Sequence, residues 1–109
     1  MSSAAIATRT MEWPSDVLAF AVKEGIRDYL DPLWEATWRV FPGAREIIVT
    51  QEDDPELRDD RYLVFEVRVP REDVPDYVEA NHRWNREFFD VCPAPLSHLI
   101  RLALTLVTQ

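Results

Sequence analysis

The stretch that most constrains the fold is residues 61–70, RYLVFEVRVP, in which apolar and more polar side chains alternate. Successive side chains of a β-strand point to opposite faces of its sheet, so this period of two indicates a strand with one buried face and one partly exposed face. The expected buried set is entirely apolar: Leu63, Phe65, Val67 and Val69. The opposite set combines Tyr62 and Val64 with the charged Glu66 and Arg68. We therefore expect residues 61–70 to form the central strand of a small sheet.

Two further strands and three helices are expected around this central strand. Their predicted bounds are residues 15–29, 31–40 and 73–91 for the helices, and residues 45–51 and 101–108 for the strands. Asp31 followed by Pro32 is expected to start the second helix, and Asp73 is expected to cap the third and longest one. The element order is then ααββαβ, in a single domain over residues 13–109 that follows a disordered tail at residues 1–12.

These elements predict an α+β fold with a small three-stranded sheet, mixed or antiparallel, covered by the long helix. Two strand orders are compatible with the sequence. The central strand can lie between the other two, with the last strand parallel to it after a helical crossover. Alternatively, the last strand can lie beside the first one and antiparallel to it. The alternation of side chains fits both orders.

The charge of the chain limits its partners. The net charge is −8, and residues 52–79 alone carry 11 acidic and 4 basic residues. A field of this sign repels nucleic acids and anionic membrane surfaces, so neither is an expected partner, whereas a basic protein would be attracted. Cys92 is the single cysteine, so no intrachain disulfide can form. No apolar run is long enough to span a bilayer, and we expect a cytoplasmic protein.

Two groups of polar side chains are candidates for ligand binding. Glu66 and Arg68 are two positions apart on the central strand, so their side chains project from the same face. On the predicted long helix, His82, Asn85 and Arg86 share one side at helical spacing. The simpler interpretation of both groups is that they are polar residues at the surface or at the margin of the core.

Other combinations of residues do not form a recognisable catalytic or metal site. The acidic segment 52–60 lacks the ligand spacing and central glycine of a calcium-binding loop. Cys92 and His98 are separated by two prolines, and the thiol is expected at a helix end, where the helix dipole disfavours a thiolate. The sequence therefore predicts no catalytic residue, no metal and no cofactor.

The polar side of the predicted sheet is the favoured interface. Tyr62 and Val64 of the central strand share this side with Ala103 and Val107 of the last strand. The set is too apolar for a fully solvated face and too polar for a core, a mixture that is common in protein interfaces. We therefore expect a non-enzymatic, acidic protein–protein interaction module that forms a homodimer through this face or an adjoining edge. The alternative is a small-molecule-binding domain or small enzyme with its site around the three polar residues of the long helix.

Overall fold

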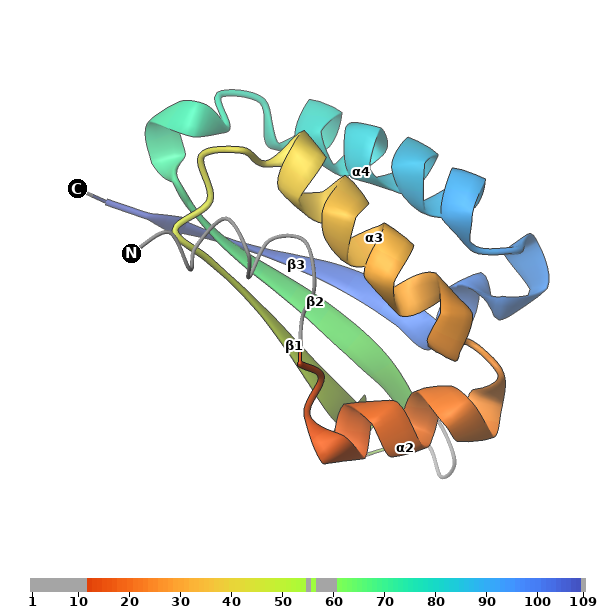
Figure 1. The fold of residues 1–109 in the computed structure, drawn as a ribbon. Helices are drawn as coiled ribbons and strands as arrows, with labels where there is room; N and C mark the ends of the chain where they lie inside the picture. Colours follow the sequence, from red (N-terminus) through yellow and green to blue (C-terminus); the bar gives the residue numbers. More distant parts are fainter. Residues whose placement is uncertain (1–11, 55, 57–60, 109) are drawn as a thin grey trace.

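Helices and strands follow one another in the predicted order ααββαβ in the computed structural model, which describes residues 12–54, 56 and 61–108 (Figure 1). The expectation for residues 1–11 and part of the expectation for segment 52–60 lie outside the described residues. The elements are α2 (Ser15–Glu24), α3 (Arg27–Val40), β1 (Glu46–Asp53), β2 (Arg61–Pro70), α4 (Tyr77–Val91) and β3 (Ile100–Val107), with two short 3-10 helices at Arg71–Asp73 and Ala94–Leu99.

The sheet is mixed, and β2 is its central strand. β1 pairs with β2 antiparallel, and β3 pairs with β2 parallel on the other side. Phe65 therefore lies between Val49 and Leu102 across the sheet. The prediction of an α+β fold is confirmed, and of the two strand orders that the sequence left open, the structure has the one with residues 61–70 in the middle.

The boundary between the first two helices differs from the prediction. α2 ends at Gly25, whose backbone is left-handed with φ 75°, and α3 begins at Arg27. The amide of Gly25 bonds to the carbonyl of Val22, and the next amide, that of Ile26, bonds to the carbonyl of Ala21. This pair of bonds is the usual helix-ending arrangement for a glycine after the last turn. The expected start at Asp31-Pro32 is wrong, because Gly25 had already ended the first helix and Pro32 is accommodated inside α3.

The start of α4 is also later than predicted. The cap is Asp76 instead of Asp73, and its carboxylate accepts a hydrogen bond from the amide of Glu79 at 3.0 Å. Asp73 instead ends the short 3-10 helix that follows β2. Both aspartates satisfy the sequence rule for a cap, but Pro75 disfavours a helical backbone at the preceding residue, Val74, which would be the first helical residue after a cap at Asp73.

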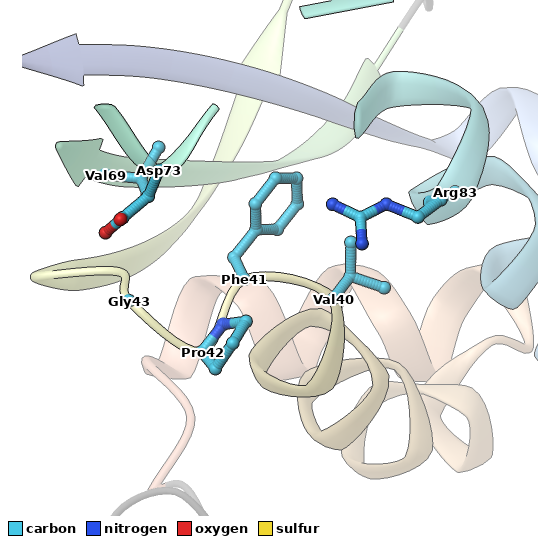
Figure 2. Close-up of a pocket in the computed structure, with 7 residues that line it drawn as sticks. All are labelled: Val40, Phe41, Pro42, Gly43, Val69, Asp73 and Arg83. Atoms are coloured by element: carbon cyan, nitrogen blue, oxygen red, sulfur yellow. The ribbon is translucent and has the colours of Figure 1, made fainter. Parts of the chain in front are cut away.

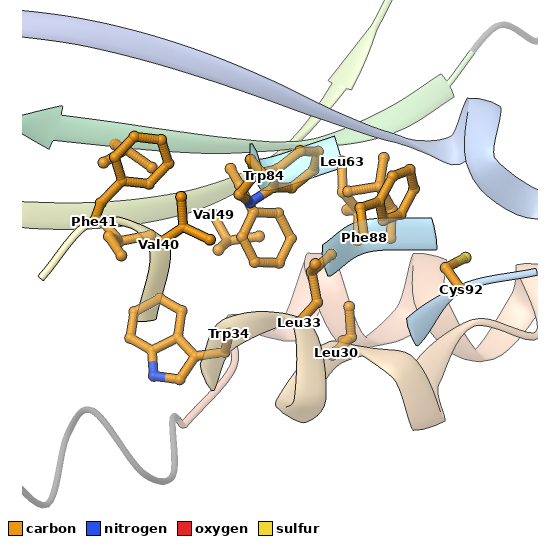
Figure 3. Close-up of a cluster of buried hydrophobic side chains, with 14 of the residues drawn as sticks. Leu30, Leu33, Trp34, Val40, Phe41, Val49, Leu63, Trp84, Phe88 and Cys92 are labelled. Carbon is orange, nitrogen blue, oxygen red and sulfur yellow. The ribbon is translucent and has the colours of Figure 1, made fainter. Parts of the chain in front are cut away.

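The core lies on one face of the sheet, between the strands and the helices. The four apolar side chains that the alternation of β2 assigns to the buried face are at most 1% exposed. Trp84 of α4 is 1% exposed, and its ring lies 6.4 Å from the ring of Phe65. Figure 3 shows side chains of α3 and α4 meeting those of β1 and β2 in this cluster. The helices of the described chain therefore pack on the face of the sheet that carries Phe65.

Candidate functional site

The opposite face of the sheet is the candidate functional surface, and we call it the open face. Its members on β2 and β3 alternate with the core residues, and they are partly or fully exposed. They are Tyr62, Val64, Glu66, Arg68, Arg101, Ala103, Thr105 and Val107. All four residues of the predicted interface are therefore on one surface. The register places Ala103 beside Glu66, so the apolar members are interspersed with charged ones.

A polar network occupies the centre of the open face. The guanidinium of Arg68 contacts Glu66 at 3.2 Å and Glu46 of β1 at 3.4 Å. The hydroxyl of Thr105 on β3 donates a hydrogen bond to Glu66 at 2.9 Å. The Thr105 hydroxyl first, and then the Arg68 guanidinium, lower the pKa of Glu66 below its ordinary value of 4.5. The two polar residues predicted as a ligand site are thus brought together, and they bind each other and their neighbours across three strands.

This lowered pKa gives a testable pH dependence. A carboxylate with a depressed pKa in the folded state stabilises the fold above its unfolded pKa, and the contribution is lost as the pH falls through the folded value. We therefore expect Glu66→Gln to lower the free energy of unfolding most above about pH 4.5, with the difference shrinking at lower pH. Urea denaturation across this pH range measures it. Thr105→Val removes the hydroxyl that donates to Glu66 and should raise the pKa of Glu66. If the loss of unfolding free energy in Glu66→Gln did not change with pH, this account would be contradicted.

A second contact on the open face involves an aromatic ring. The guanidinium of Arg101 lies 3.7 Å from the centre of the Tyr62 ring, which is the geometry of a cation–π interaction. The two residues come from β2 and β3 and cover part of the exposed aromatic surface. The open face is therefore a mixed surface, in which half-buried Val64 and Ala103 lie among paired charges.

The other predicted polar group lies elsewhere. His82, Asn85 and Arg86 are exposed on α4, which packs on the core side of the sheet. The guanidinium of Arg86 lies 3.8 Å from the carboxylate of Glu79, which is two turns earlier on the same face of the helix. The structure therefore keeps these three residues together on a helix surface but separates them from Glu66 and Arg68 of the open face.

A shallow pocket that the sequence did not indicate lies at the end of α3. Its volume is about 280 Å³, and its lining residues are Val40, Phe41, Pro42, Gly43, Val69, Asp73 and Arg83. Asp73 and Arg83 lie on opposite sides of the Phe41 ring (Figure 2). Gly43 fits here because a side chain would meet the Asp73 carboxylate. The residues come from four separate segments, so no local pattern could have predicted their meeting.

Cys92 lies at the end of α4, where its side chain is buried. Cys92 is 1% exposed, and burial raises the pKa of its thiol, which disfavours the reactive thiolate. Among residues 12–54, 56 and 61–108, no cluster of three histidine, cysteine or acidic side chains is arranged to hold a metal ion. Over the same ranges, none of the helices combines the length with the apolar composition that a membrane span requires.

Comparison with known proteins identifies no relative. No protein-family model, no curated protein and no solved structure matches this chain. A functional proposal therefore depends on the surfaces of the described residues.

Proposed function

We propose that this chain is a non-enzymatic protein–protein interaction domain that self-associates through its open face or an edge adjoining that face. The observation that carries the proposal is the open face itself, where apolar side chains such as Val64 and Val107 are only half-buried while the described helices pack on the other side. Faces of this mixed composition are common in interfaces between proteins. The smallest closed assembly that such a contact can form is a twofold dimer.

The chemistry of the open face supports binding more than catalysis. Its charged groups are engaged with one another, as the contacts of Glu66 with Arg68 and Thr105 illustrate. A general acid or base is most effective when its pKa lies near the working pH. The pKa of Glu66 is instead lowered, so this carboxylate stays in its charged form. The alternative of a ligand site at His82, Asn85 and Arg86 stays a prediction, since the pocket at the end of α3 is lined by Arg83 instead.

Net charge suggests the other partner class. A chain with a net charge of −8 attracts a protein with a basic surface and repels nucleic acids and anionic membranes. The same charge opposes the approach of a second copy. We place both kinds of encounter in the cytoplasm, in keeping with a single, buried cysteine that forms no intrachain disulfide.

Salt dependence separates the two kinds of encounter. Salt screens the repulsion between two acidic copies, so we expect self-association to strengthen as the ionic strength rises from about 0.05 M to about 0.5 M. Binding to a basic partner should weaken over the same range for the same reason. Static light scattering over a range of protein concentrations measures the first effect. A mass of one chain at every concentration and salt level would contradict the proposed self-association.

A further inference from the structure

The exposed flank of α4 carries two large apolar side chains with polar residues between them. Val78 and Phe89 are 62% and 55% exposed, although side chains of this kind are usually buried. Between them, His82 and Asn85 are also exposed, so the spacing along the helix is four, three and four residues. This is the spacing of the seam between two packed helices. We call these four residues the α4 stripe.

The α4 stripe faces away from α3. On the other side of α4, Glu87 forms an ion pair at 2.8 Å with Arg39 of α3, and Arg83 lines the pocket at the end of α3. Helical spacing places the stripe on the opposite flank from these two residues. The helical layer follows the strand order, since α2 packs against β1 and α3 packs against α4, and α4 connects β2 to β3. The stripe therefore lies on the flank of the layer above β3.

The α4 stripe is complementary to itself when the helix is reversed. A twofold axis midway between His82 and Asn85 places each of these residues opposite the other in a second copy. The same axis places Val78 of one copy opposite Phe89 of the other. The seam then has four layers, related in pairs by the twofold axis, with Val78 and Phe89 meeting at its ends and His82 and Asn85 meeting at its centre.

Charges beside the α4 stripe fit the same axis. Glu79 and Arg86 each follow a stripe residue by one position, on the same side of the seam. In antiparallel helix pairs, side chains at these positions meet their counterparts across the seam. Each Glu79, which lies 3.8 Å from Arg86 of its own chain, then also faces Arg86 of the other copy. The surrounding charge also favours this site, because residues 80–109 carry 3 basic and 2 acidic residues in a chain of net charge −8.

The edge of β3 can join the same contact. β3 is an edge strand whose single charged residue is Arg101, whereas the opposite edge strand, β1, carries Glu46, Glu52 and Asp53. Charges protect an edge strand from pairing with another chain, and β3 has little of this protection. When two copies pair along β3, the centres of their β2–β3 pairs are two strand spacings apart, which is about 9.5 Å. Two α4 helices that lie above these pairs would be separated by the same distance. Packed helices are separated by about 8–10 Å, so one axis serves both contacts.

We propose that a second copy of this chain docks on the α4 stripe in antiparallel orientation, about a twofold axis perpendicular to the sheet that also brings the two β3 edges together. This inference rests on the self-association proposed above and assigns it to the edge that adjoins the open face, together with the α4 stripe, instead of to the open face itself. The pairing makes a continuous six-stranded sheet. Because the axis is perpendicular to the sheet, the open faces of both copies point the same way and stay available to another protein.

Variants of exposed residues test this arrangement by light scattering. Phe89→Arg places a charge in the seam and should make the protein monomeric, with its circular dichroism unchanged. Val22→Arg is the matched control, since Val22 is 62% exposed on α2, and it should stay dimeric. Val64→Arg on the open face should also stay dimeric. A dimer that Val64→Arg dissociates and Phe89→Arg does not would overturn this inference while leaving the proposed self-association intact.

A charge exchange tests the orientation of the two copies. Glu79→Arg places like charges together twice in each dimer and should raise the dissociation constant about tenfold. The reverse variant, Arg86→Glu, should have a similar effect. The double variant Glu79→Arg with Arg86→Glu should restore most of the affinity in the antiparallel arrangement. Additive losses in the double variant would exclude this pairing, and a wild-type protein that is monomeric at every concentration would exclude self-association altogether.

Discussion

Replacing Phe65 by alanine should lower the free energy of unfolding by about 3–5 kcal/mol. Phe65 is 0% exposed at the middle of β2, and its ring lies near those of Trp13 and Trp84 at 6.3 and 6.4 Å. Truncation therefore loses the transfer free energy of the ring and leaves a cavity among large, rigid neighbours that cannot easily fill it. Small domains have about 5–15 kcal/mol of stability in total, so the variant should unfold at much lower urea concentration.

The adjacent residue supplies the control for this experiment. Val64 is on the same strand but on the open face, where it is half-buried. Val64→Ala should therefore cost less than about 1.5 kcal/mol. A loss below about 1 kcal/mol for Phe65→Ala would mean that the core does not depend on the central strand in the way that the packing indicates.

Replacing Thr37 by valine should cost about 2 kcal/mol, although the two side chains have nearly the same shape. Thr37 is 0% exposed in α3, and its hydroxyl accepts a hydrogen bond from the indole of Trp84 at 2.9 Å. The hydroxyl also donates to the carbonyl of Leu33 at 2.7 Å. Valine would leave the buried indole N–H without its acceptor, and the cost of that unpaired group dominates because no cavity is formed.

Serine at the same position separates the hydrogen bond from the packing. Thr37→Ser keeps the hydroxyl and removes one methyl group, so it should cost only about 1 kcal/mol. The fluorescence of Trp84 overlaps with that of three other tryptophans, so denaturation followed by circular dichroism is the appropriate measurement. If valine were less disruptive than serine, packing instead of the Trp84 hydrogen bond would determine the stability at this position.

The parts of the fold that the sequence predicted are those set by side-chain periodicity. The bounds of β2 were predicted to the residue, because alternation of apolar and polar side chains is a direct consequence of burial on one face. Helix ends were harder to predict. The predicted helix over residues 15–29 has Gly25 in its interior, whereas the left-handed backbone of Gly25 makes it the end of α2. Asp73 and Asp76 are both acceptable caps, and the restriction that Pro75 places on Val74 favours the later one.

For the candidate surfaces, the sequence could predict which side chains share a face but not which neighbours they contact. Alternation alone shows which side chains share the open face, so Tyr62, Val64, Ala103 and Val107 could be grouped in advance. Their neighbours could not be, because the contact of Glu66 with Thr105 requires β3 to lie beside β2 in one particular register. The exposure of Val78 and Phe89 could not be predicted either, since apolar residues on an amphipathic helix ordinarily indicate a core.

The two pairings of the central strand have different kinetic consequences. Asp53 pairs with Arg61 across the hairpin, 8 positions along the chain, whereas Leu63 pairs with Ile100, 37 positions along. Closing the longer loop costs about 1.4 kcal/mol more chain entropy. Folding should therefore begin with the β1–β2 hairpin and end when β3 arrives, since contacts between distant residues form late. Until that moment the second edge of β2 is a row of unpaired amides and carbonyls, so the rate at which β3 arrives determines how long the chain stays vulnerable to aggregation.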